Sequence, residues 1–301
     1  MSLVDAKILI TGPAGQIAFP IARRLAADNE VWGIARFGEE ESRRRVEALG
    51  VTTRRIDLGT GEFGDLPGDF THVLHLAVAQ GPGRDTDHGL RVNAEGTGLL
   101  MQHCASARFL VMSTFSVYEP QPDRWYPFAE TDQMGDTRQP YSPTYSVSKI
   151  GQEAVARTTA RLFAIPTVIA RMNVAYGTNG GLPALHLDAL RRGDPIVLRD
   201  PGPTPYSPIH EDDIVAQVGP LLEAASVPAT VVNWAGDDVV TAEQWVAELE
   251  QLTGLTADIR RVATPNSVAG SVSDNTRRLA ITGPCEVSWP DGLARMVAER
   301  A

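Results

Sequence analysis

The feature that most constrains the fold is an alternation of short apolar segments with segments of helical periodicity. Strands are expected at 6–11, 30–36, 52–57, 71–77, 107–114, 165–171, 228–236 and near 257–262. Helices are expected at 15–29, 39–50, 89–106, 145–163 and 241–253. Glycines are expected to interrupt the helix at 89–106. Apolar strands separated by helices indicate a parallel sheet that is covered on both faces.

The predicted fold is therefore α/β: a Rossmann-type doubly wound parallel sheet with a smaller C-terminal α/β region that binds substrate. The dinucleotide-binding domain is expected to cover 1–172, and 206–236 returns to it. The smaller domain is expected to comprise 173–205 and 237–301, because the strand–helix alternation loosens after residue 172.

Composition excludes several classes of partner. The formal net charge of −10 makes nucleic acid a poor partner. No apolar run approaches the roughly 20 residues that span a bilayer, so no membrane partner is expected. The sequence carries no signal-peptide pattern, and its two cysteines fit no metal or redox spacing, which favours a cytoplasmic protein.

A glycine-rich turn, ITGPAGQIA at 10–18, joins the first strand to the first helix. Gly12 would make the tight turn, and Gly15 would let the backbone approach a pyrophosphate at the helix N-terminus. Ala18 stands where a third glycine is usual, and alanine is small enough to pack the helix on the sheet. This turn predicts a dinucleotide site.

The last residue of the predicted second strand bears on the cofactor. A dinucleotide site usually has an acid there for the ribose hydroxyls, whereas this chain has Arg36. Arginine suits a 2′-phosphate, so NADP is preferred over NAD. The alternatives are that Arg36 faces solvent or stacks on the adenine. Asp57 and Leu58, at the end of the third strand, fit a contact with the adenine edge, although Asp57 also suits an ordinary loop.

The stretch YSPTYSVSK at 141–149 contains a candidate reaction centre. Ser142 is expected to cap a helix with Pro143 at its first position, which places Tyr145 in the first turn and Lys149 one turn later on the same face. Tyr141 has no lysine at that spacing. The chain has 25 arginines and only two lysines, so a lysine at this position is conspicuous.

A phenol with a pKa near 10 is a poor base at neutral pH, but a nearby ammonium and a helix N-terminus both lower that value. Tyr145 could then exchange a proton with a substrate hydroxyl while hydride moves to or from a nicotinamide. Thr114 supplies a hydroxyl at the carboxyl edge of the sheet, where such folds bind ligands. The alternative is a chance Tyr/Lys pair on a solvated helix face.

Several motifs together resemble the extended short-chain dehydrogenase/reductases of the NAD-dependent epimerase/dehydratase family. They occur in the family's order over residues 7 to 215: TGPAGQIA (11–18), DL (57–58), HLA (75–77), NAEGT (93–97), STFSVY (113–118), YSVSK (145–149), ARMNVAYG (170–177) and IHEDDIV (209–215).

The resemblance implies catalytic roles. Tyr145 would be the acid/base, Lys149 would hold the nicotinamide ribose and tune Tyr145, and Thr114 would hydrogen-bond the reacting oxygen. Asn93 would serve structure or a proton path, or only a helix kink. Glu153, one turn past the lysine, would be structural.

The resemblance also implies binding roles. Cofactor contacts would come from Gly12, Gly15, Gln16, Ile17, Leu76, Ala77 and Lys149. Asn173 lies where the family begins its substrate pocket, and Tyr206 stands where nucleotide-sugar enzymes tend to have an arginine. Arg199 could substitute, but the simpler interpretation is that no nucleoside diphosphate is clamped. Phe115 and Ser116 replace the carboxylates of sugar dehydratases, which disfavours dehydration.

These observations predict an NAD(P)-dependent oxidoreductase acting on a secondary alcohol or ketone of a small, sugar-like substrate. The alternatives are an NAD-dependent sugar C4-type epimerase and a non-catalytic dinucleotide-binding regulator. The family often pairs through the helix that carries Tyr145, so a homodimer is expected. No metal is expected: His72 and His75 are three apart on one strand and face opposite ways, and the acids in 210–213 begin a helix.

Overall fold

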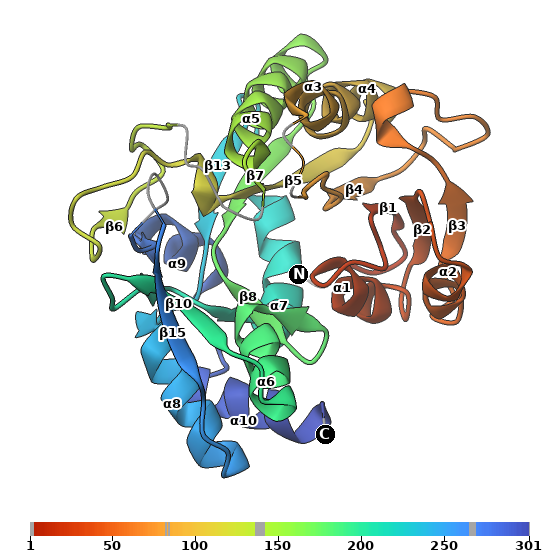
Figure 1. Ribbon diagram of the computed structural model, residues 1–301. Coiled ribbons are helices and arrows are strands. Elements are labelled where there is room, and N and C mark those ends of the chain that lie inside the picture. Colours follow the sequence, from red (N-terminus) through yellow and green to blue (C-terminus); the bar gives the residue numbers. More distant parts are fainter. Residues whose placement is uncertain (1–2, 82, 84, 136–141, 265–268, 301) are drawn as a thin grey trace.

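Seven parallel strands form the central sheet of the computed structural model, which describes residues 3–81, 83, 85–135, 142–264 and 269–300 (Figure 1). The strands lie in the order β3 (Thr52–Arg55), β2 (Glu30–Ala35), β1 (Lys7–Thr11), β4 (His72–His75), β5 (Arg108–Thr114), β7 (Thr167–Met172) and β13 (Thr230–Trp234). The seven strands predicted for this sheet are therefore present, each within two residues of its predicted ends. Strand order reverses between β1 and β4, and ligands of such folds bind beside that point.

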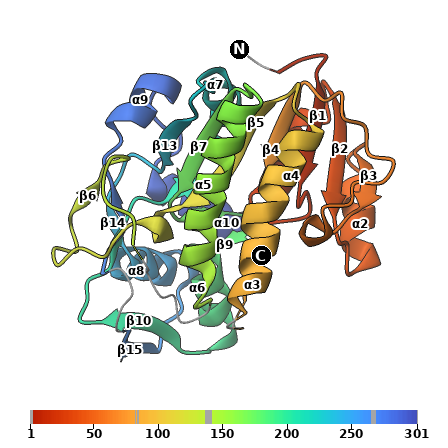
Figure 2. The ribbon, with the colours of Figure 1, turned by 90° about the horizontal axis from the view of Figure 1, so that it is seen from above.

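Helices cover both faces of the sheet, as predicted (Figure 1), and Figure 2 looks down on one of these two layers. One face packs against α1 (Ala18–Leu25), α2 (Glu40–Glu47) and α7 (Glu211–Glu223). The other face packs against α4 (Gly96–His103) and α5 (Tyr145–Leu162). Neighbouring residues of one strand face opposite cores: Ile8 and Ile10 lie in the first and Leu9 in the second. No helix in the described ranges is both long and apolar enough to cross a bilayer.

A second core lies below the sheet in Figure 1, among α6 (Leu182–Arg192), α8 (Ala242–Thr253) and α10 (Trp289–Glu299). Trp245 is fully buried there. Beside these helices β10 (Ile196–Asp200) pairs in parallel with β15 (Ile259–Ala263), close to the strand predicted near 257–262. This separate core supports the division into two domains that we propose.

Shorter elements connect these parts. The helical ones are η1 (Leu58–Thr60), α3 (Thr86–Gly89), η2 (Leu90–Glu95), η3 (Phe115–Val117) and α9 (Thr276–Thr282). The extended ones are β6 (Pro127–Phe128), β8 (Ala175–Gly177), β9 (Gly180–Gly181), β11 (Pro205–Tyr206), β12 (Ile209–His210), β14 (Val240–Thr241) and β16 (Val272–Ser273).

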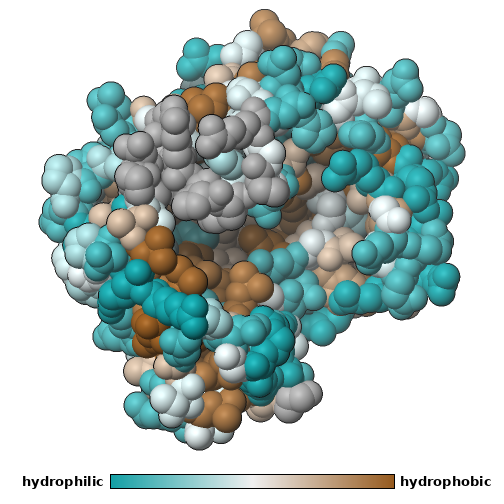
Figure 3. All heavy atoms as spheres, in the orientation of Figure 1, coloured by the Kyte–Doolittle hydropathy of each residue, from teal (hydrophilic) through white to brown (hydrophobic). Residues whose placement is uncertain are grey.

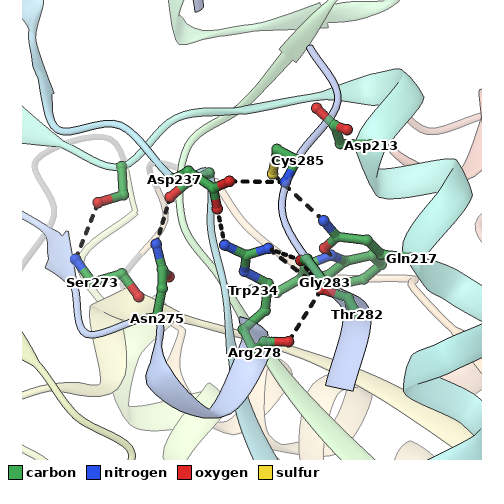
Figure 4. A network of polar contacts seen from close by, with 12 residues as sticks. Asp213, Gln217, Trp234, Asp237, Ser273, Asn275, Arg278, Thr282, Gly283 and Cys285 are labelled. Carbon is green, nitrogen blue, oxygen red and sulfur yellow. Dashed lines mark hydrogen bonds and ion pairs between the residues drawn. The ribbon is translucent and has the colours of Figure 1, made fainter. Parts of the chain in front are cut away.

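A polar network holds the segment between α9 and α10 in place (Figure 4). Arg278 of α9 is fully buried, forms an ion pair with Asp237 and donates to Gly283 O at 2.7 Å. Asp237 also accepts from the Cys285 amide at 2.8 Å. Neither α9 nor α10 was predicted, because these contacts join residues far apart in the sequence.

The glycines at 89–106 do not break the helical path, contrary to the prediction. α3, the π-helical η2 and α4 follow one another without a gap. A Cβ at Gly96 would lie 2.7 Å from Leu58 O, and one at Gly98 would lie 2.7 Å from a Val155 methyl carbon. The missing side chains therefore allow the helix to approach η1 and α5 closely.

Gly96→Ala tests this role. Alanine normally stabilises a helix relative to glycine by about 1 kcal/mol. Here the added methyl meets backbone, so the free energy of unfolding is expected to fall by roughly 1–3 kcal/mol. Urea unfolding measures the change, with Gly38→Ala as control because no atom lies within 4 Å of that Cβ position. Stabilisation by Gly96→Ala would contradict the packing argument.

Candidate active site

Thr114 and the helix that begins with Tyr145 meet at the edge where the parallel strands end. Thr114 is the last residue of β5, and Tyr145 is the first residue of α5. The Ser146 hydroxyl donates to Ser116 O at 2.7 Å, which holds the first turn of α5 against the segment that follows Thr114. Thr114 is buried and its hydroxyl accepts from the Ser116 amide at 3.2 Å, while Tyr145 is half-buried.

The predicted cap of this helix is wrong. Helix α5 begins at Tyr145, in agreement with the predicted range 145–163, but its cap position is Thr144, which makes no side-chain capping bond. The Ser142 hydroxyl instead accepts from the Gly81 amide at 3.1 Å and so ties the loop after β4 to α5. Pro143 therefore precedes the helix. Tyr141 lies outside the described residues.

Lys149 lies one turn into α5 with only 2% of its surface exposed. Its ammonium donates to Met112 O in β5 at 2.6 Å. Burial lowers the pKa of Lys149 to about 7, and the nearby carboxylate of Glu153 opposes that shift. Near neutral pH, a charged group placed beside Lys149 would therefore change the fraction of Lys149 that is protonated.

Glu153 of α5 and Arg171 of β7 form a buried ion pair beneath Lys149. The two guanidinium–carboxylate bonds are both 2.8 Å long, and the two residues are at most 1% exposed. The Ser113 hydroxyl of β5 donates to the same carboxylate at 2.7 Å. Burial would raise the pKa of Glu153, but the Arg171 hydrogen bonds and charge outweigh it and lower the pKa. Sequence reasoning missed Arg171, although an arginine ending an apolar strand was a usable signal.

Asn93 lies in η2 and joins the loop after β4 to α5. Its side-chain oxygen accepts from the Ala79 amide at 2.7 Å. Its amide nitrogen donates to Ala79 O and to the Ser148 hydroxyl, each at 2.9 Å. Every one of these bonds stays within the protein, so the geometry assigns Asn93 a structural task, and the proton path stays a prediction.

The glycine-rich turn at 10–18, here called the phosphate loop, has backbone N–H donors without partners among the described residues. Gly12 adopts φ +66°, and a Cβ there would lie 3.1 Å from Ala77 Cα, so only glycine fits. Within the described ranges the N–H groups of Gln16, Ile17 and Ala18 have no hydrogen-bond acceptor. Orphan amides at a helix N-terminus form an anion-binding site. The loop therefore fits a pyrophosphate.

Two other residues of the loop have internal tasks. The Gly15 amide donates to Gly12 O at 2.9 Å. The Gln16 side chain donates to Ala175 O at 3.1 Å, so its backbone amide is the group left for a phosphate. Both residues lie where the prediction placed them, but Gly15 shapes the loop and does not offer its own N–H.

The residue that follows β2 is a cation. Arg36 is exposed, and its side chain makes no hydrogen bond or ion pair with any residue that the structure describes. Asp57 accepts from the Gly59 amide at 2.9 Å and thereby caps η1, while Leu58 is buried. One oxygen of Asp57 therefore has a local role, and contact with an adenine stays a prediction.

His75 links the phosphate loop to the helix layer. Thr97 donates its hydroxyl proton to a carbonyl of η2, so it must accept from His75 Nε2 at 2.7 Å. His75 Nδ1 then accepts from the Thr11 hydroxyl at 2.9 Å. Thr11 in turn accepts from the amides of Leu76 and Ala77 at 3.0 and 2.8 Å. His75 therefore packs beside the predicted cofactor loop.

This arrangement keeps His75 neutral. Burial, followed by the charge of Lys149, lowers the pKa of His75 to about 3. His72, on the same strand, is only half-buried. His210 caps α7 by accepting from the Asp212 amide at 3.2 Å. No group of three potential metal ligands occurs among the described residues.

Asn173 joins segments that come from three parts of the chain. Its side-chain oxygen accepts from the amides of Val174 and Ser207 at 2.8 and 3.2 Å. Its amide nitrogen donates to Ser271 O at 2.7 Å. Three of its four hydrogen-bonding positions are thus used to build the wall of the site.

Tyr206 packs against Trp245 with ring centroids 5.3 Å apart. Arg199, on β10, donates to Thr264 O at 2.9 Å.

A hollow separates the sheet domain from the smaller region, and apolar residues gather on the side formed by the smaller region (Figure 3). The contact of Trp245 with Tyr206 was not predicted, because the sequence of α8 alone does not show which residue its tryptophan packs against.

Comparison with known proteins agrees with this geometry. A model of the NAD dependent epimerase/dehydratase family matches residues 8–233. A probable UDP-glucuronate 4-epimerase of Rhizobium meliloti (strain 1021) is 25% identical, over 97% of this chain and 96% of the relative.

Solved structures share the predicted fold. UDP-glucuronic acid 4-epimerase from Bacillus cereus, in complex with UDP-glucuronic acid and NAD, has a TM-score of 0.83 at 22% identity, covering 97% of this chain and 98% of its own. The dehydratase DesIV from Streptomyces venezuelae, with NAD and TYD bound, has a TM-score of 0.82 at 23% identity, covering 97% and 96%. The predicted fold class is confirmed.

The neutral state of His75 predicts acid sensitivity. Its folded pKa of about 3 lies below the ordinary value of 6.5, so the unfolded chain binds the proton first as the pH falls. Stability should be lost between about pH 6.5 and 3, by up to about 1.4 kcal/mol per pH unit from this group.

Urea unfolding of wild type and His75→Gln measures this effect. The stability difference between the two should be constant above pH 7 and shrink below pH 6.5. His88→Gln, in the short helix α3 and partly exposed, is the control. A difference that stays constant down to pH 4 would show that His75 is not held neutral.

Proposed function

Because the chain belongs to the NAD dependent epimerase/dehydratase family, we propose that it moves a hydride between a nicotinamide dinucleotide and a secondary hydroxyl or ketone of a small, sugar-like substrate. The observation that carries the proposal is the placement of Thr114, Tyr145 and Lys149 at the carboxyl edge of the sheet. The phosphate loop that would hold the cofactor lies at the same edge.

The chain's own residues would move the proton. Tyr145 takes it from the substrate hydroxyl, or returns it to a carbonyl, and Thr114 hydrogen-bonds the same oxygen. A phenolate at Tyr145 and an ammonium at Lys149 stabilise one another, which is worth most where water is excluded. A bound nicotinamide would accept or give back the hydride. The loop amides would hold its pyrophosphate, and Lys149 its ribose.

We further propose that NADP is preferred over NAD. Arg36 presents a guanidinium beside the first βα turn and has no acid partner among the described residues. A 2′-phosphate would give it a bidentate, charge-assisted partner. The relatives with solved structures bind NAD, so this preference would distinguish the chain from them.

A sugar C4-type epimerase is the second candidate. The Rhizobium meliloti relative and the Bacillus cereus structure are described as UDP-glucuronate 4-epimerases, and an epimerase needs the same three residues with no further acid. Phe115 and Ser116 offer no carboxylate, which disfavours dehydration. An epimerase should retain NAD through purification, whereas a reductase should be purified without it. A cofactor-binding regulator would need the phosphate loop but not Tyr145 or Lys149.

A homodimer is proposed as the assembly. The outer surface of α4 and of the end of α5 carries Leu99, Leu162 and Phe163, which are 42%, 74% and 44% exposed. Exposed apolar side chains on two neighbouring helices suit a self-complementary interface.

Replacing the proposed acid/base tests the function. A dehydrogenase screen with both cofactors against sugars, sugar acids and aromatic alcohols supplies the assay. Tyr145→Phe should then lower kcat roughly 10²- to 10⁴-fold with little change in cofactor affinity, because only the proton-transferring oxygen is lost. Tyr126→Phe, which removes only a bond to Asp132, is the control. Unchanged turnover in Tyr145→Phe would refute the mechanism.

Arg36→Ala tests the cofactor preference. Loss of a charge-assisted bond should weaken NADP⁺ binding roughly ten- to hundredfold and leave NAD⁺ binding within about twofold. Calorimetric titration gives both dissociation constants. Arg23→Ala is a matched control, since Arg23 is also exposed and makes no side-chain bond within the described ranges. An equal effect on both cofactors would contradict the NADP assignment.

A further inference from the structure

The turn between β8 and β9 is in direct contact with the phosphate loop. The Asn179 side-chain nitrogen donates to Gln16 O at 2.8 Å and to Gly15 O at 3.3 Å. The Gln16 side chain donates back to Ala175 O. A Cβ at Gly180 would lie 3.1 Å from Gln16 Cγ, so the two segments leave no space between them. In Figure 1 this turn extends from β8 toward α1.

The two carbonyls that Asn179 binds belong to the peptide units that carry the phosphate-binding donors. Gly15 C=O is in one planar unit with the N–H of Gln16, and Gln16 C=O is in one unit with the N–H of Ile17. Holding each oxygen therefore fixes the direction of the N–H on the opposite side of the same plane. It also polarises the peptide, which makes that N–H a stronger donor.

Asn179 is itself held firmly. The Glu211 carboxylate at the start of α7 accepts from the amides of Thr178 and Asn179 at 3.0 and 3.2 Å. The Thr178 hydroxyl donates to Glu299 at 2.6 Å, and Arg300 donates to Thr178 O at 2.6 Å. The turn is thus anchored by α7 and by the end of α10, and it can act as a fixed support for the loop.

We propose that Asn179 is a positioning residue for the dinucleotide, which aims the N–H groups of Gln16 and Ile17 at the pyrophosphate. The inference rests on the proposed function and deepens it. It makes the smaller region, through this one side chain, a part of the cofactor site. Because both N–H groups would be directed at the pyrophosphate, which NAD and NADP share, the effect should be the same for the two cofactors, unlike that of Arg36.

Two variants test the proposal by calorimetric titration with NAD⁺, NADP⁺ and ADP-ribose. Asn179→Ala should raise all three dissociation constants by one common factor of about ten, because two hydrogen bonds to the phosphate loop are lost. Asn179→Asp keeps the shape of the side chain but turns a carboxylate toward two carbonyls, and it should cost at least as much. ADP-ribose lacks the nicotinamide, so an equal loss excludes the nicotinamide end, and an equal loss for NAD⁺ and NADP⁺ excludes the 2′-phosphate.

Asn275→Ala is the matched control, because it removes a side-chain amide bond of the same kind, to Gly236 O, outside the phosphate loop and its support; its dissociation constants should stay within about twofold of wild type. A merely structural Asn179 would lower the urea midpoint of the free protein without weakening ADP-ribose binding, and that result would overturn the inference alone. Failure of the wild-type protein to bind any dinucleotide would instead overturn the proposed function, and this inference with it.

Discussion

The buried ion pair between Glu153 and Arg171 fixes how α5 lies on the sheet. Tyr145, Lys149 and Glu153 are four residues apart, so they form one stripe along the helix. Arg171 holds the end of that stripe against β7, and Ser113 holds it against β5. A buried pair contributes little net stability, because removing two charges from water is costly. Its contribution here is orientation: it sets the rotation of α5, and with it the positions of Tyr145 and Lys149.

The buried position of Lys149 is unfavourable for its charge in the free protein. Its ammonium is buried, and its pKa of about 7 records the cost of removing that charge from water. A buried methionine would suit the packing better. Residues that break a local rule of stability in this way are concentrated at functional sites. The strain would be relieved when a phenolate or a ribose hydroxyl becomes the partner of the ammonium.

Much of the fold could be predicted from the sequence because apolar periodicity and parallel pairing are local and repetitive. The phosphate loop was found for the same reason: Gly12 must follow β1 directly. The predictions failed where distant segments decide the outcome. Ser142 bonds to Gly81 rather than capping α5, and Gly96 makes room for η1. Asn179 lies beside the phosphate loop although its turn is about 160 residues further along the chain. No spacing rule reveals such a contact.

The central claim is that Lys149 makes Tyr145 a base near neutral pH, and the phenolate absorbance near 295 nm tests it most directly. Wild type and Tyr145→Phe, both saturated with cofactor, are titrated from pH 6 to 10. Tyr118 does not interfere, since burial raises its pKa to about 12. The account predicts one phenolate in the difference curve that forms well below the ordinary pKa of 10. Difference curves that show no ionisation below pH 9 would contradict it.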